Sequence, residues 1–343
     1  MLKVAFIAPN MADYLADSVL HGLRSLLDDQ VVDYPKAERL YQDCGESTWR
    51  QIRGCGFTLY GLLENIEIDR DGIVQKILAR EFDLVIFGEI YEDYKLFQQL
   101  ASRLDARKVA LLDGADAQSM YAYAGKWWRP PACWFLAWPE RFLYFKRELT
   151  PLTLRYRSYL LLPEWLCERM TPPGNMRRIA FSIPEEKIVR ELPVKQKLFG
   201  IHVVDEEVAC RLPGAKTAGA FTTEEGYYTD LQASRFAITT KRAGWDCLRH
   251  YEIAANACVP CFRQLDRKPA SCAPHGLDSS NCVIYQNYDD LMRQIESIDD
   301  QRYAELQSGA LAWVRANTTV ERARHLLAAI DPELLSRLPS NGH

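Results

Sequence analysis

The residues best suited to chemistry gather in one short stretch in the second half of the chain. Three basic side chains, a glycine and two carboxylates lie there: Lys241, Arg242, Gly244, Asp246, Arg249 and Glu252. An apolar strand pattern at 236–239 precedes the glycine, and a helix pattern follows it. In a parallel α/β sheet, ligands bind at the carboxyl ends of strands, and the free N–H groups of a helix start attract phosphate. The stretch therefore predicts an anion-binding site.

Spacing within this stretch assigns different roles to its charged residues. Arg249 is three residues from Asp246 and three from Glu252, so the three side chains share one helix face. We expect Asp246 to cap the helix and Arg249 to grip a phosphate group with two parallel bonds. Glu252, one turn deeper, can accept hydrogen bonds from a ribose diol. A surface ion pair would show the same spacing, but the glycine loop and the apolar Val259–Pro260 pair after the helix favour a binding site.

Alternating strand and helix patterns surround the stretch and must position it. In the first half, strands are expected at 3–8, 31–32, 83–88 and 108–112, and helices after Asp13, at 71–80 and at 91–103. In the second half, strands are expected at 178–183, 201–204, 236–239, 258–262 and 282–285, and helices at 246–256, 288–298, 302–316 and 319–330. This alternation indicates parallel sheets with helices on both faces, the α/β class.

The length of 343 residues suits two domains of roughly 150 residues each. The Pro172-Pro173-Gly174 turn is a natural linker. We therefore expect a first domain at 1–168, a second domain at 169–330 and a tail at 331–343.

A longer pattern resembles the donor-binding half of glycosyltransferases of the GT-B fold. It runs Tyr227-Tyr228-x-x-Leu231-x-x-Ser234-x-Phe236-Ala237-Ile238, then Gly244-x-Asp246-x-x-Arg249-x-x-Glu252, and ends at Val259-Pro260. Within that fold, the pattern resembles the exostosin-like and CgeB-like groups. The sequence departs from them at Ala257-Cys258, where they usually place Ala-Gly or Gly-Cys. The likeness covers about 227–325 well, whereas 1–120 shares only a general pattern.

The resemblance implies two Rossmann-like domains facing a central cleft, with a nucleotide-activated sugar held by the second and an acceptor by the first. Arg249 matches a position beside the diphosphate, Glu252 matches the carboxylate on ribose or sugar hydroxyls, and Lys241 matches a second phosphate contact more weakly. The implied reaction moves a sugar from a nucleoside diphosphate to an acceptor hydroxyl. It implies no metal and no cofactor beyond the donor substrate.

An inverting reaction of this kind needs a base on the acceptor oxygen. Candidates at strand ends of the first domain are Asp13, Glu89 and Asp113. Asp113 directly follows a buried strand, so we expect it to point into the cleft as a catalytic residue beside Glu252. An ordinary Asp-Gly turn is the alternative. A retaining enzyme needs no such base, and the sequence leaves the stereochemistry open.

Composition excludes several classes of function. The 42 basic and 46 acidic residues give a net charge of −4, which argues against nucleic-acid binding driven by net charge. No apolar run reaches the roughly 18 residues of a membrane span, and the apolar run at 4–8 is too short for a signal peptide. We expect a cytoplasmic protein, with peripheral membrane contact left open. The spacing of Cys258 and Cys261 could suit zinc, but both fall in an expected buried strand and favour the core.

The acceptor is open from sequence: a glycan, a lipid-linked glycan, a protein, a nucleic acid or a metabolite. The basic residues Lys146, Arg147, Arg155 and Arg157 could face an anionic acceptor or be merely solvated. The tryptophan-rich segment 121–165 could form an acceptor wall, but packed core is favoured. Two other functions compete with transfer, namely a nucleotide-sugar epimerase of the same fold and a non-catalytic nucleotide-binding module.

Overall fold

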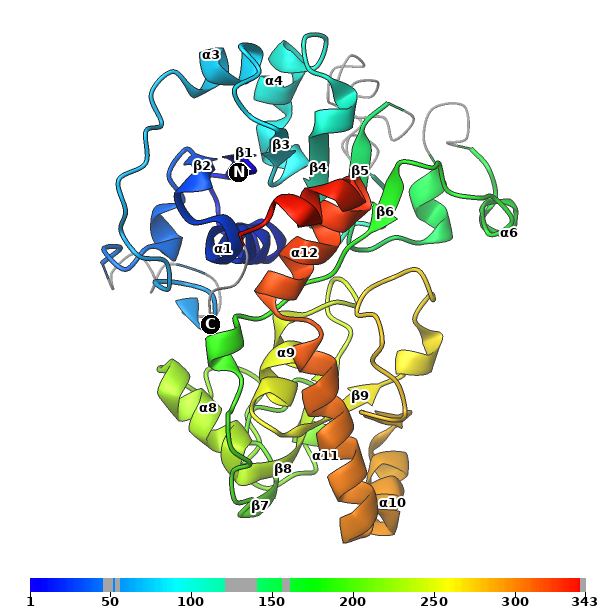
Figure 1. The fold of residues 1–343 in the computed structure, drawn as a ribbon. Coiled ribbons are helices and arrows are strands. Elements are labelled where there is room, and N and C mark those ends of the chain that lie inside the picture. The colour runs from blue at the N-terminus through cyan, green and yellow to red at the C-terminus, as the bar shows by residue number, and fades with distance from the viewer. Residues whose placement is uncertain (46–51, 53–55, 121–140, 156–160, 340–343) are drawn as a thin grey trace.

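The computed structural model describes residues 1–45, 52, 56–120, 141–155 and 161–339, which form two lobes, each built on a parallel sheet (Figure 1). The sheet of the first lobe has the order β2 (Val31–Tyr34), β1 (Val4–Ile7), β3 (Leu84–Phe87), β4 (Val109–Asp113), β5 (Leu143–Lys146) and β6 (Met176–Arg178). The sheet of the second lobe has the order β10 (Val283–Tyr285), β9 (Val259–Arg263), β8 (Ser234–Thr240) and β7 (Lys197–Phe199).

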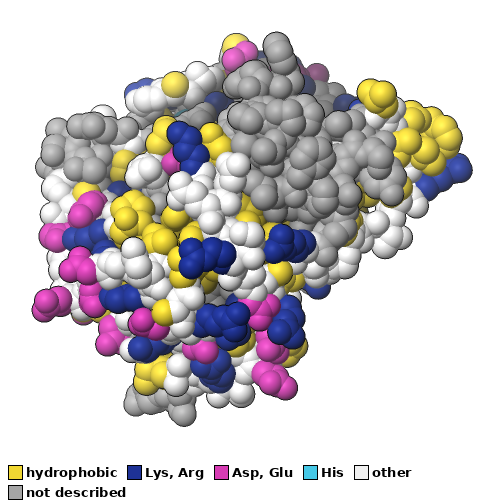
Figure 2. Space-filling view, turned by 90° about the horizontal axis from the view of Figure 1, so that it is seen from above, with side chains coloured by type: hydrophobic (Ala, Val, Ile, Leu, Met, Phe, Trp, Pro, Cys, Tyr) yellow, Lys and Arg dark blue, Asp and Glu magenta, His cyan; other side chains and the backbone are white. Residues whose placement is uncertain are grey.

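The central strands of the first lobe are buried along their whole length, as expected for a parallel sheet with helices on both faces. The helices of this lobe are α1 (Tyr14–Leu27), α3 (Ile73–Leu78), α4 (Ile90–Leu100) and the short α6 (Glu164–Cys167). Asp13 caps α1 through a hydrogen bond from the Ala16 N–H at 2.8 Å, which confirms the predicted helix start. Basic and acidic side chains are intermixed among the described residues of the face in Figure 2, in keeping with the net charge near zero.

The helices of the second lobe are the short α7 (Glu206–Ala209), then α8 (Glu224–Ala233), α9 (Leu248–Ala255), α10 (Tyr288–Ser297) and α11 (Asp300–Arg315). The expected strands and helices from 236 to 316 are confirmed, with small shifts at their ends. The loop from β8 into α9 carries the stretch singled out in the sequence. It lies at the carboxyl end of a central parallel strand, on the side of the sheet that faces the first lobe (Figure 1).

The last helix, α12 (Thr319–Ile330), returns to the first lobe and packs along α1 (Figure 1). The two helices are so close at Gly22 that only glycine fits there: an added Cβ would lie 1.9 Å from the Thr319 carbonyl oxygen. The neighbouring His21 places Nδ1 2.9 Å from Thr319 Oγ1. The C-terminal part of the chain thus completes the first lobe.

Strand pairing corrects the expected division at 168/169. β6 pairs with β5 in the first sheet, with Met176 beside Tyr144, so the chain still belongs to the first lobe at Arg178. The strand expected at 178–183 is wrong, because β6 ends at Arg178 and Ile183 forms only an isolated bridge to Thr318. The expected helix 319–330 is present but packs on the first lobe, and Leu334 in the tail is buried. The strand expected at 201–204 is wrong, since β7 lies earlier in the chain and His202 forms only an isolated bridge to Lys216.

Two further expectations concern the surface. Trp165 of α6 is exposed, while the other tryptophans of the aromatic segment, Trp127, Trp128, Trp134 and Trp138, lie outside the described residues. None of the helices in the described part of the chain is long and apolar enough to cross a membrane.

Candidate active site

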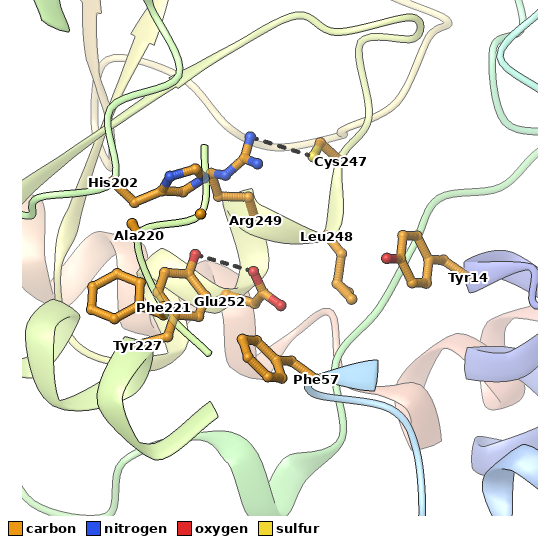
Figure 3. A pocket seen from close by; sticks show the side chains of 11 residues that line it. Tyr14, Phe57, His202, Ala220, Phe221, Tyr227, Cys247, Leu248, Arg249 and Glu252 are labelled. Atoms are coloured by element: carbon orange, nitrogen blue, oxygen red, sulfur yellow. Dashed lines mark hydrogen bonds between the residues drawn. The ribbon is translucent and has the colours of Figure 1, made fainter. Parts of the chain in front are cut away.

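A cavity of about 260 Å³ lies between the two lobes, lined by residues of both (Figure 3). The first lobe contributes Tyr14, at the start of α1, and Phe57. The second lobe contributes His202, Gly219, Ala220, Phe221, Tyr227, Cys247, Leu248, Arg249 and Glu252. Arg249 and Glu252 were both predicted from sequence, and the helical spacing puts both side chains into this one cavity.

Arg249 is a half-buried cation without an acidic partner in the described part of the chain. No carboxylate there lies within 4.0 Å of its guanidinium, and its Nη1 lies 4.0 Å from Cys247 Sγ. Cys247 is the N-cap of α9 and gives no side-chain hydrogen bond to the helix. The cavity therefore presents a guanidinium beside the uncapped N-terminus of an eight-residue helix, a combination that attracts an anion.

Glu252 is buried, with 8% of its surface exposed, and each of its oxygens accepts one hydroxyl. The Tyr227 hydroxyl donates to Oε2 at 3.2 Å (Figure 3). Thr58 Oγ1 donates to Oε1 at 2.5 Å. Burial raises the pKa of this carboxyl, while the bond from Thr58 and the charge of Arg249 lower it. Because a carboxylate has about four acceptor positions, Glu252 can still receive hydroxyls from a ligand.

His202 lines the cavity beside Arg249, a position that the sequence analysis did not single out (Figure 3). Burial, together with the charges of Arg249 and Arg242, lowers its pKa to about 4, so the imidazole is neutral at pH 7. Its Nδ1 is buried and has no hydrogen-bond partner among the described residues. Its only sequence signal is a histidine 25 residues before Tyr227, where the donor-binding pattern begins, and this does not by itself indicate a site.

The other predicted members of the stretch do not line this cavity. Lys241 and Arg242 are exposed, and Lys241 lies over the Trp245 ring at 5.1 Å. Asp246 is buried and accepts hydrogen bonds from the Phe181 N–H at 2.7 Å and the Tyr251 hydroxyl at 3.0 Å. The prediction that Asp246 caps α9 is wrong, because the N-cap is Cys247 and the Asp246 carboxylate bonds the Phe181 N–H and the Tyr251 hydroxyl instead.

Residues of the first lobe contact the loop before α9 at Gly244. The buried Glu148, just after β5, accepts hydrogen bonds from the Asp246 N–H at 3.1 Å and from Arg147 Nη1 at 2.9 Å. Arg147 also donates to the Asp246 carbonyl at 2.8 Å and pairs with Asp116. Lys146 and Arg147 are thus buried structural cations, so the idea that they face an anionic acceptor is wrong.

Asp113 is fully buried and does not line the described cavity. It accepts hydrogen bonds from the Tyr144 hydroxyl at 2.6 Å and from Lys146 Nζ at 2.8 Å. The expectation that Asp113 faces the cleft fails, because β5, which the sequence analysis did not predict, places Lys146 directly beside it.

The other two base candidates also lie outside the described cavity wall. Burial raises the pKa of Asp13 to about 6. Burial also raises the pKa of Glu89, as do the charges of Asp13 and Asp113. Glu252 is the one carboxylate among the described lining residues. Elsewhere in the described chain, no three His, Cys, Asp or Glu side chains are grouped as metal ligands.

Comparison with known proteins identifies the fold. No family model matches the sequence, and no curated protein matches it. The solved structure of Anabaena Alr3699/HepE in complex with UDP matches with a TM-score of 0.52 at 11% identity, over 98% of this chain and 100% of that one. The complexes of the same protein with UDP and glucose and with UDP-glucose match with a TM-score of 0.51 at 10% identity and the same coverage.

These likenesses show the fold: the chain has the GT-B architecture of two Rossmann-like domains facing a cleft. The predicted fold class is confirmed. The exostosin-like or CgeB-like subtype stays a prediction, because no family model matches.

Proposed function

We propose that the protein is a glycosyltransferase that moves a sugar from a nucleoside diphosphate sugar to an acceptor hydroxyl. The observation that carries the proposal is Arg249, a cation with no acidic partner among the described residues, beside Glu252 in the cavity between the lobes. Arg249 would bind the diphosphate, and Glu252 would accept hydrogen bonds from hydroxyls of the ribose or the sugar. A GT-B fold alone would fit several functions, so the proposal depends on this pair.

In the reaction, the bond between the sugar's anomeric carbon and the phosphate oxygen breaks, and its electrons stay on the nucleoside diphosphate. The acceptor oxygen forms the new bond and releases its proton to the departing phosphate or to solvent. Negative charge therefore grows on the leaving phosphate, where Arg249 and the α9 N–H groups can stabilise it in a partly enclosed site. We propose that these groups act without a metal, so that excess EDTA leaves transfer unchanged.

We assign no base role to Asp113, because its carboxylate is held by Tyr144 and Lys146. The acceptor stays within the classes named from sequence. UDP-glucose is the first donor to try, since Alr3699/HepE, which shares the fold, was crystallised with it.

The test is a thermal-shift panel of UDP-, GDP-, TDP- and CMP-sugars, because a ligand that binds the native state raises its apparent stability. We expect stabilisation by one nucleoside diphosphate class, absent in Arg249→Ala. Slow hydrolysis of that donor without an acceptor would support transfer, whereas tight binding with no turnover would support a binding module. No stabilisation by any donor would refute the proposal.

A further inference from the structure

Thr58 connects the first lobe to the cavity of the second. Its side chain is 1% exposed, and its hydroxyl donates to Glu252 Oε1 at 2.5 Å. A hydroxyl has one proton, so the Tyr228 hydroxyl, 2.9 Å away, is the donor in its contact with Thr58 Oγ1. The Thr58 N–H donates to Glu224 Oε1 at 2.6 Å. Both the N–H and the hydroxyl of Thr58 therefore bond to side chains of α8 and α9 in the opposite lobe.

Neighbouring contacts hold Thr58 in this place. Lys187 Nζ lies 2.7 Å from the second oxygen of Glu224, which fixes the carboxylate that receives the Thr58 N–H. Phe57 stacks on Tyr227 with ring centroids 6.4 Å apart and an interplanar angle of 26°. Tyr227 in turn donates to Glu252, so each oxygen of Glu252 accepts one hydroxyl, one from each lobe.

The backbone at Thr58 is unfavourable for the residue that occupies it. Its φ is 75°, in the left-handed region that a β-branched residue rarely adopts. Glycine or asparagine would fit this conformation with less strain, but neither carries a hydroxyl. A threonine kept in this conformation suggests that its hydroxyl has a use, and the structure directs that hydroxyl at Glu252.

We propose that Thr58 is a positioning residue for donor binding: its hydroxyl orients the Glu252 carboxylate, so that the second lobe's donor site is completed by the first lobe. This inference rests on the proposed function. Figure 3 shows Glu252 near Tyr227, Phe57 and Leu248 in the cavity. Thr58 fixes one of its oxygens from the opposite lobe, and the remaining acceptor positions of the carboxylate are left for ligand hydroxyls.

The direct test replaces Thr58 with valine, which keeps the shape and removes the hydroxyl, and with serine, which keeps the hydroxyl. We expect Thr58→Val to weaken UDP binding about tenfold in isothermal titration calorimetry, because a bond to a charged group is lost. Thr58→Ser should stay within about threefold of the wild type, since it restores that bond. Tyr228→Phe is the matched control. It removes a hydroxyl from the same cluster, but that hydroxyl bonds to Thr58 and makes no bond to Glu252.

The pH dependence separates positioning from simple packing. The groups facing Glu252 are Arg249 on its own helix and Tyr227, Tyr228 and Glu224 on α8. Thr58→Val leaves these groups in place but removes a donor that favours the ionised carboxylate. UDP binding should therefore fail at a higher pH in Thr58→Val than in the wild type as the solution is acidified.

A double mutant keeps the proposal testable if Thr58→Val is less stable. If Thr58 acts through Glu252, Thr58→Val should change UDP affinity less than twofold in a Glu252→Gln background. Equal losses in both backgrounds, or a lower melting temperature with unchanged UDP affinity and pH dependence, would overturn the inference. Absence of UDP binding by the wild type would refute the proposed function itself, a distinguishable result.

Discussion

Glu148 of the first lobe fills the space in which a side chain at position 244 of the second lobe would stand. A Cβ added at Gly244 would lie 2.5 Å from Glu148 Oε1 and 2.9 Å from Arg147 Nη1. The same Glu148 oxygen accepts the Asp246 N–H two residues later. The loop that leads into α9 is therefore shaped by the other lobe, and the positions of Arg249 and Glu252 depend on that contact.

Gly244→Ala should disturb this contact. Glu148 is buried and also accepts a hydrogen bond from Cys272 Sγ at 3.0 Å, so it cannot swing away without losing bonded partners. We expect a loss of about 1–3 kcal/mol in the free energy of unfolding, together with weaker UDP binding. Gly174→Ala is the control, because a Cβ there meets nothing within 4 Å. Urea unfolding and UDP titration of both variants check this, and equal behaviour of the two would contradict it.

Arg249→Ala should weaken UDP binding at least tenfold with little effect on stability. The guanidinium has no acidic partner in the described part of the chain, so its removal breaks no ion pair there. Arg293→Ala is a matched control, because Arg293 is an exposed helical arginine with a surface contact to Asp290. Calorimetric titration with UDP and thermal unfolding are the measurements. Wild-type affinity in Arg249→Ala would remove the basis of the proposed function.

Local spacing predicted the part of the site that one helix carries. Arg249 and Glu252 needed only a helix start after a glycine loop, and that pattern is read within a dozen residues. The residues that complete the cavity, Tyr14, Phe57 and His202, come from distant parts of the chain. No pattern in one sequence brings them together. Tyr14 and Phe57 reach the cavity through the docking of the two lobes, whereas His202 reaches it through the fold of the second lobe.

Asp113 shows why a correct strand can still give a wrong role. Its strand was predicted, and the end of a parallel strand does point toward the cleft side of a sheet. The neighbour that neutralises it, Lys146, lies on β5, which was missed because it follows a segment rich in tryptophan and proline without a clear period. A site residue can be assigned only when its neighbours across the sheet are known.

Asp113→Asn should therefore act on stability more than on the chemical step. The variant leaves the fully buried Lys146 ammonium without a counter-charge, which costs on the order of 3–5 kcal/mol. Asp105→Asn is the control, since its pair with Arg107 is exposed. Replacing Lys146 with methionine in Asp113→Asn should recover part of the loss, as judged by urea unfolding. If Asp113→Asn kept the stability of the wild type but its kcat fell to near zero, Asp113 would instead be supported as the base.

Acid should destabilise the protein through His250 in particular. Its Nε2–H donates to the Trp245 carbonyl at 3.0 Å, and its Nδ1 accepts from the Thr239 hydroxyl at 2.9 Å, so the buried ring is held neutral. Burial lowers its pKa from 6.5 to about 3. Between these two values the unfolded chain binds a proton that the folded chain does not, so stability falls as pH falls, by roughly 1 kcal/mol per pH unit.

Buried carboxyls act in the opposite direction and must be separated from this effect. Burial raises the pKa of Asp93 to about 7 and that of Asp13 to about 6. As pH falls, each carboxyl binds a proton in the folded chain before it does so in the unfolded chain, which adds to the stability of the protein. The difference between the wild type and His250→Gln isolates the histidine, because both proteins keep these carboxyls. We expect the variant to be less stable at pH 7.5 and to lose less on going to pH 5, as measured by urea unfolding. Equal losses of stability in the two proteins between pH 7.5 and pH 5 would contradict this prediction. They would mean that His250 binds a proton as readily in the folded chain as in the unfolded chain, against the two hydrogen bonds of a neutral ring.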